Sequence, residues 1–414
     1  MKGWKGVLAR LSIFGMVVGP GIITANVDND AGGIATYSVA GAKFGYEMLW
    51  VLVPTCVLLV LVQEMCSRMG GVTGKGLSAL IRERFGLKAS FYLMLALIVT
   101  NAGNVIADFA GVAASAEIFG MHRAWAVPIG AFLLWRMVVK GTYQTVERVF
   151  FVACFFYIAY IISGFLAHPD WKEAVHMTLV PHVRWTGDSL YMIVGIVGTT
   201  IAPWMQFYQQ ASVVEKGIPL KHYKYARLDT IVGAVAVTIV CYFIVVACAA
   251  TLHREGISIE TAGDAAAALK PAAGRYCAGL FAFGLMVASL FGAAILPIST
   301  ATSVCEAMGW ESGVDRRFAE APHYYSIYTV VLFTGAVVAL LASVRLLVPI
   351  MLLSQVINGI LLPVVVFFML RITSDKSIMG AHSNGRWFNL VAWAGSGLVA
   401  AMSLMMVVLM LVHH

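Results

Sequence analysis

Apolar runs of about 20 residues recur along the whole chain, and they restrict its fold more than any other feature. As a helix, a run of that length crosses ~30 Å of hydrocarbon. We count eleven such runs, at residues 12–43, 46–67, 90–119, 124–139, 146–167, 189–213, 228–252, 276–304, 324–344, 346–370 and 388–412. Only 12% of the residues are charged, against roughly 25% in soluble domains. The sequence therefore predicts an all-α membrane protein of about 11 transmembrane helices, with residues 1–414 as a single transmembrane domain.

Basic residues are distributed unevenly between alternate loops. With the N-terminus inside, the inner loops hold 20 Lys and Arg residues and the outer loops hold 8. This bias follows the positive-inside rule, so we expect a cytoplasmic N-terminus, an outer C-terminus and a multi-pass protein of the cytoplasmic (inner) membrane. The net charge of +7 then sets topology, and no nucleic-acid partner is expected. No cleavable signal peptide is expected either, because the first apolar stretch is too long and lacks a small-residue cleavage site.

Motifs for other chemistry are absent from the sequence. The seven cysteines lie mostly within apolar runs and form no CxxC pair, so buried thiols are expected and disulfides or zinc ligands are not. Neither HExxH nor Gly-x-Ser-x-Gly occurs, so we expect no enzyme and no cofactor. The sequence leaves the oligomeric state open; a monomer is plausible.

Two of the apolar spans are interrupted near their middle. Span one is broken at residues 26–33 and span six at residues 198–204. Two broken spans separated by five positions suggest two five-helix repeats, the second inverted in the membrane. We place these repeats at about 11–167 and 188–371, with an extra helix at about 388–412. Broken helices of this kind meet at the midplane, where their freed carbonyls bind substrate or ions.

Asp28 and Asp30, in the first break, are the most unusual residues of the chain. A carboxylate at mid-membrane costs ~3 kcal/mol on insertion scales. No basic residue lies in the core of any expected span, so a salt bridge does not explain them. One alternative is that an Asp caps a half-helix by accepting backbone N–H bonds. Two carboxylates together favour a cation site.

The remaining polar groups near the breaks offer oxygen atoms. Asn26 and Asn29 lie in the first break, and Thr199 and Thr200 lie in the second. Sites made only of oxygen suit Mg²⁺, Ca²⁺ or Mn²⁺, whereas sulfur ligands favour softer metals. The residues therefore favour a hard divalent cation.

Several segments resemble the natural resistance-associated macrophage protein (NRAMP) family of divalent metal transporters. They are Gly19-Pro20-Gly21, residues 30–36 and 40–46 in span one, residues 198–203 in span six, and Leu353-Ser354-Gln355-Val356 with Leu362-Pro363 in span ten. The similarity extends over essentially the whole chain. It implies the leucine-transporter fold of inverted five-helix repeats with broken helices 1 and 6, and alternating access around a central metal.

The resemblance also implies roles for single residues. Asp30 matches the metal-binding aspartate of the family, and Gln355 matches a polar residue that approaches the metal. Val27 and Thr199 occupy positions where family members can offer a backbone carbonyl. These four residues are therefore candidate metal ligands.

Two expected ligands are missing. Gly33 stands where the family has a metal-binding asparagine, and Ala202 stands where it has a methionine, so both side chains are lost at the site. Asp28 has no counterpart in the usual motif and is expected to replace part of the lost ligand set.

Positions that the family links to protons also differ. Asp108 matches an aspartate on the proton route, but Asn101 and Gly111 stand where acidic residues are expected, and Trp204 and Gln209 replace two histidines. Because a proton relay needs a chain of titratable groups, only Asp108 remains as an obvious member. The alternative for Asp108 is a packing hydrogen bond to Asn101 or Asn104.

The departures from the family agree with one another. Loss of the thioether removes a soft ligand, and loss of two side chains makes room for a partly hydrated Mg²⁺, which dehydrates reluctantly. The pattern is most similar to the NRAMP-related magnesium transporter branch. We expect import of Mg²⁺, and also Mn²⁺, without strict proton coupling. The alternatives are a proton-coupled Mn²⁺ or Fe²⁺ transporter and, less favoured, an amino-acid carrier of the same fold.

Overall fold

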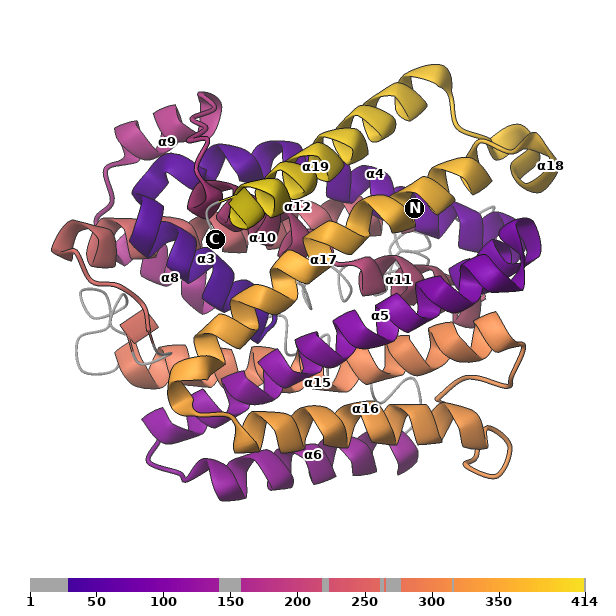
Figure 1. Cartoon of the computed structure of the whole chain (residues 1–414), viewed down its shortest axis with the longest axis horizontal. Coiled ribbons are helices and arrows are strands. Elements are labelled where there is room, and N and C mark those ends of the chain that lie inside the picture. Colours follow the sequence, from indigo (N-terminus) through magenta and orange to yellow (C-terminus); the bar gives the residue numbers. More distant parts are fainter. Residues whose placement is uncertain are drawn as a thin grey trace, which may run out of the picture.

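Helices account for nearly all of the structure, a computed structural model that describes residues 29–140, 158–217, 223–260, 264–265, 277–314 and 316–412 (Figure 1). Within these ranges there is no strand. The helices are α3 (Ala31–Phe44), η1 (Gly45–Met48), α4 (Leu49–Thr73), α5 (Leu77–Ile118), α6 (Arg123–Lys140), α8 (Ile158–Leu166), α9 (Trp171–Leu179), α10 (Gly187–Thr200), α11 (Pro203–Glu215), α12 (Tyr223–Cys248), η4 (Ala249–His253), α15 (Cys277–Met308), α16 (Pro322–Leu341), α17 (Val344–Thr373), α18 (Lys376–Met379), η6 (Gly380–His382) and α19 (Arg386–Val412).

Eight helical stretches in the described part of the chain are long and apolar enough to cross a membrane. The first, Ala31–Thr73, joins α3 to α4 through η1 and therefore covers the expected spans one and two. Helices α6 and α8 lie at the expected spans four and five. Each of the eleven predicted spans thus contains helix in its described part, although residues 12–28 of span one, 146–157 of span five and 276 of span eight are outside the described residues. The prediction of an all-α, multi-pass membrane protein is confirmed.

Helices α5, α15, α16 and α6 pack side by side in one part of the bundle (Figure 1). Small residues allow the close approach: a Cβ on Gly335 of α16 would lie 2.5 Å from Cγ1 of Val105 on α5. Within a membrane, helices associate through such close packing and through hydrogen bonds between polar side chains. The buried face of α5 supplies polar side chains for such hydrogen bonds, because it carries Asn101, Asn104 and Asp108.

The predicted break in span six is confirmed. Helix α10 ends at Thr200 and α11 begins at Pro203. Between them Ile201 (φ −130°, ψ 56°) and Ala202 (φ −62°, ψ 137°) have non-helical backbone. Proline suits the first position of a helix because its missing N–H has no intrahelical partner there. The sequence therefore ends one half-helix and starts the next within three residues.

The position of Arg68 differs from the one expected from the sequence. The expected span two ends at residue 67, which would leave Arg68 in the following inner loop, but α4 continues to Thr73 and buries Arg68, whose side chain is 9% exposed. Its guanidinium pairs with Glu64 at 3.1 Å and donates to the carbonyl of His382 at 2.6 Å. A basic residue inside this helix is tolerated because its charge is paired, and the pair holds α4 against the segment before α19.

Candidate metal-binding site

The N-terminus of α3 is built around Asp30. Asp30 is the N-cap of the helix and is 4% exposed. Its Oδ1 accepts the backbone N–H of Gly33 at 2.7 Å. The expected alternative of a capping aspartate therefore holds for this oxygen. The positive end of the helix dipole also stabilises the carboxylate, so this buried charge has a local structural support.

A second carboxylate reaches the same helix end from α5. Oδ1 of the fully buried Asp108 accepts the N–H of Ala31 at 3.3 Å, whereas its Oδ2 has no hydrogen-bond partner in the described structure. The alternative of a packing hydrogen bond from Asp108 to Asn101 or Asn104 is not seen among the described residues. Asn101 instead donates to Thr300 Oγ1 at 2.8 Å. Asp30 and Asp108 thus occupy one helix end, and within the described part of the chain no ion pair joins either of them to a base.

Gln355 of α17 lies between the two broken spans. A Cβ on Gly32 would lie 1.9 Å from Gln355 Nε2 and 3.3 Å from Asp30 Oδ1, so the amide packs beside the Asp30 carboxylate. The backbone carbonyl of Gln355 meets α10, because a Cβ on Gly198 would lie 2.0 Å from that oxygen. Gln355 therefore contacts α3 with its side chain and α10 with its backbone.

An amide network extends from Gln355 to α5. Asn358 donates to Gln355 Oε1 at 2.8 Å, and Asn358 and Asn104 exchange two hydrogen bonds of 3.1 Å. We had not assigned Asn358 a role from the sequence. The sequence does contain an indication of this role, since an Asn in the middle of an apolar span usually bonds across helices. The network is neutral and buried, and it fixes the orientation of the Gln355 amide.

The C-terminus of α10 supplies the other side of the site. Thr199 is 2% exposed in its last turn, and Ala202 is 2% exposed in the extended link to α11. The last carbonyls of a helix have no intrahelical partners, and this end of the helix dipole is negative. A cation is thus favoured at the end of α10, as it is beside the Asp30 carboxylate.

The candidate ligands fall into three groups. Asp30, Gln355 and the buried Gly33 meet at the start of α3, and Thr199 and Ala202 lie at the α10–α11 break, which contacts Gln355 through Gly198. Asp28 and Val27 lie outside the described residues. Within the described part of the chain, no three His, Cys, Asp or Glu side chains converge as a metal site. Oxygen from one or two carboxylates and from backbone carbonyls is the donor set that remains, which suits a hard dication. The Gln355 amide presents its Nε2 to this helix end, while its Oε1 accepts from Asn358.

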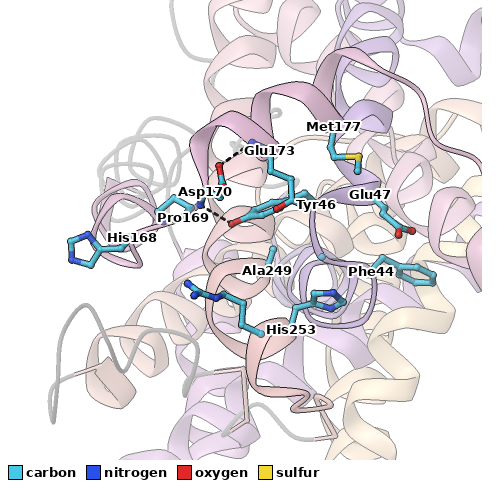
Figure 2. A pocket seen from close by; sticks show the side chains of 12 residues that line it. Phe44, Tyr46, Glu47, His168, Pro169, Asp170, Glu173, Met177, Ala249 and His253 are labelled. Atoms are coloured by element: carbon cyan, nitrogen blue, oxygen red, sulfur yellow. Dashed lines mark hydrogen bonds between the residues drawn. The ribbon is translucent and has the colours of Figure 1, made fainter.

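A separate cavity of about 480 Å³ lies away from the helix breaks, where η1, α9 and η4 meet. Figure 2 shows Tyr46 beside Asp170, the N-cap of α9, and near His253 of η4. Three carboxylates line it, of which Asp170 caps α9 and Glu47 pairs with Arg184, and no three His, Cys, Asp or Glu side chains of the described residues converge here as a metal site. This cavity therefore lacks a converging set of free ligands, and the helix break remains the better candidate.

Comparison with known proteins places the chain among membrane transporters. The family model described as natural resistance-associated macrophage protein-like matches residues 21–409. The divalent metal cation transporter MntH of Bacillus subtilis (strain 168) is 24% identical over 427 residues, covering 99% of this chain and 94% of that protein.

Solved structures agree on the fold. The manganese transporter of Eremococcus coleocola superposes with a TM-score of 0.77 at 18% identity, over 95% of this chain and 86% of that chain. MhsT in complex with L-phenylalanine superposes with a TM-score of 0.60 at 12% identity, over 94% and 98% of the two chains. The expected leucine-transporter type of fold is confirmed, while the repeat boundaries stay a prediction. The match of the family model over nearly the whole length shows that this chain belongs to the natural resistance-associated macrophage protein (NRAMP) family.

Proposed function

We propose that this protein imports divalent metal cations, with Mg²⁺ as a substrate and Mn²⁺ also accepted, through a site between α3, α10 and α17. The observation that carries the proposal is the buried Asp30 carboxylate beside the Gln355 amide, with no basic partner among the described residues. Related proteins carry names that agree: one is a divalent metal cation transporter and another a manganese transporter. Asp28 and Val27 of the first break are proposed to complete the ligand set.

The preference for a hard ion rests on the side chains that the two breaks lack. Ala202 offers no sulfur where the family has a methionine, and Gly33 offers no side chain where the family has an asparagine. A site without a thioether loses its bias toward softer metals. A partly hydrated Mg²⁺ needs few protein ligands because it keeps several waters. These two positions therefore support Mg²⁺ together with Mn²⁺.

Entry without strict proton coupling is the second part of the proposal. Asn101 and Asn104, which precede Asp108 on α5, form hydrogen bonds with neutral partners. A Cβ at Gly111 would lie 2.2 Å from Ser289 Oγ, so the space of an acidic side chain is already filled. An inside-negative potential favours entry of a dication by about 4.6 kcal/mol per 100 mV. A proton gradient is not needed for uptake. Entry into the cell assumes the expected topology, with the N-terminus inside.

The amino-acid carrier is disfavoured by the occupied end of α3. Carriers of this fold bind a substrate carboxylate at a half-helix N-terminus. Here two N–H groups of that terminus are taken by protein carboxylates, Gly33 by Asp30 and Ala31 by Asp108. A third carboxylate would meet like charges instead of free donors. The shared fold of MhsT therefore does not extend to its ligand.

Proteoliposomes with internal metal and pH indicators test the proposal. Wild-type protein should admit Mg²⁺ and Mn²⁺ without acidifying the lumen, and Asp30→Ala should abolish both fluxes. Asp188→Asn is the matched control, because Asp188 is an exposed carboxylate paired with Lys43 away from the site. Acidification that accompanies Mn²⁺ entry, with no Mg²⁺ entry, would show a proton-coupled manganese transporter. Amino-acid uptake unaffected by dications would overturn metal transport.

A further inference from the structure

Asp108 is enclosed by three helices at a point where one of them has no side chain. Its carboxylate lies on α5, accepts the N–H of Ala31 on α3, and packs against Gly292 on α15. A Cβ at Gly292 would lie 2.4 Å from Asp108 Oδ2 and 2.6 Å from Oδ1. Distances under 3 Å are not seen for real Cβ atoms, so any larger residue at position 292 must displace the carboxylate.

One turn away, the roles of α5 and α15 are exchanged, with α5 supplying the glycine and α15 the side chain. At Gly111 of α5, a Cβ would lie 2.2 Å from Ser289 Oγ and 2.5 Å from the Cβ of Ala31. The side chain of Asp108 thus fits over a glycine of α15, and the side chain of Ser289 fits over a glycine of α5. Both contacts lie against Ala31, so α5 and α15 together define where α3 begins.

From this geometry we infer that Asp108 and Gly292 position the metal-binding Asp30, with Asp108 acting through the backbone of α3. The N–H that Asp108 accepts belongs to Ala31, the residue next to Asp30. Asp30 itself accepts the N–H of Gly33. Two carboxylates therefore share the first turn of α3. Asp108 fixes the helix end, and Asp30 binds the cation. The inference rests on the proposed function, since it concerns the same site.

The fixed helix end matters because Asp30 is a short side chain. Rotation of the Ala31 peptide would move the Asp30 backbone and turn its carboxylate away from the Gln355 amide, which packs against Gly32. Metal affinity depends on ligand placement, and loss of an outer hydrogen-bond partner typically costs 10–100-fold in affinity. Asp108 requires only a hydrogen-bond acceptor for this role, and Gly292 requires only the absence of a side chain.

Mn²⁺ binding to purified full-length protein, measured by isothermal titration calorimetry, tests the role of Asp108. Asp108→Ala should raise the Kd about tenfold. Asp108→Asn should recover most of the affinity, because the Asn Oδ1 can accept the same N–H. A Kd for Asp108→Asn as high as that of Asp108→Ala would overturn the positioning role. Wild-type protein that binds no Mn²⁺ would overturn the proposed function and the positioning role with it.

A double-mutant cycle tests the role of Gly292. Gly292→Ala should raise the Kd about fivefold in the wild-type background and have little effect beside Asp108→Ala, since residues in contact are not additive. Gly279→Ala on the same helix is the control, because nothing lies within 4 Å of its Cβ position. Equal effects of Gly292→Ala in both backgrounds would overturn the inference. If Gly292→Ala does not fold, recovery of folded protein on adding Asp108→Ala would support it, and failure to recover would contradict it.

Discussion

The hydroxyl of Tyr37 on α3 lies 2.7 Å from Oγ1 of Thr200 at the end of α10. Thr200 donates its own hydroxyl proton to the Ile196 carbonyl at 2.6 Å, so Tyr37 is the donor to Thr200. The two residues are 163 positions apart and belong to the two broken spans. The half-helices that flank the candidate site are thus joined directly, and we expect them to move together.

Replacing Tyr37 by Phe removes this link. The variant should lower the free energy of unfolding by about 1 kcal/mol, the usual net value of one buried hydrogen bond. Thermal unfolding in detergent measures it. Tyr92→Phe is the control, since Tyr92 is 68% exposed, and it should leave the stability unchanged. Equal melting temperatures for the two variants would show that the link contributes nothing.

Gly198 is required where α10 crosses α17. Its Cβ would lie 2.0 Å from the Gln355 carbonyl and 2.3 Å from the Gly359 nitrogen, both backbone atoms that cannot move aside cheaply. Gly198→Ala should destabilise the protein by about 1–3 kcal/mol, as overpacking does. Gly195→Ala is the matched control on the same helix, because its nearest atom would lie at an ordinary 3.5 Å. Similar stability losses for both variants would contradict the close crossing.

Gln355 should contribute to binding of both metals. Gln355→Ala removes the amide that packs beside Asp30 and accepts from Asn358, so the KM for uptake of Mg²⁺ and of Mn²⁺ should rise about tenfold. Leu353→Ala on the same helix should not change the KM, because Leu353 is 51% exposed on the bundle surface. An unchanged KM in Gln355→Ala would remove the amide from the site.

Ala202 should control the choice of metal. Ala202→Met introduces a thioether, so the preference for Mn²⁺ over Mg²⁺ in competitive uptake should rise about tenfold. Ala202→Leu separates chemistry from size, because it adds a similar volume without sulfur; it should reduce both fluxes without shifting the preference. A shift of equal size in the Leu variant would assign the effect to volume instead of to the thioether.

The sequence predicted the site where its chemistry was unusual. Asp30 and Gln355 stood out as polar residues of apolar spans that match a family motif, and the structure places them side by side. The packing bond considered as an alternative for Asp108 is not formed, since Asn101 and Asn104 share its helix face but bond to α15 and α17. Which N–H a side chain reaches depends on the register between helices, which periodicity within one helix does not contain.

Close helix contacts at two glycines account for much of what could not be predicted from the sequence. In the sequence, Gly198 stands out only as part of the span-six break and Gly292 does not stand out, because glycine is frequent in membrane helices. Their roles depend on what approaches them, Gln355 in one case and Asp108 in the other, and both neighbours come from distant parts of the chain. Asp28 and Val27 lie outside the described residues, so their predicted roles as ligands stay predictions.

The location of bound Mn²⁺, found by anomalous diffraction from crystals of the full-length protein, tests the central claim most directly. The account predicts a peak within about 2.5 Å of an Asp30 carboxylate oxygen, facing Gln355 and the end of α10, and no such peak in Asp30→Ala. A peak only in the cavity beside Tyr46, or one at the helix break that persists in Asp30→Ala, would contradict it.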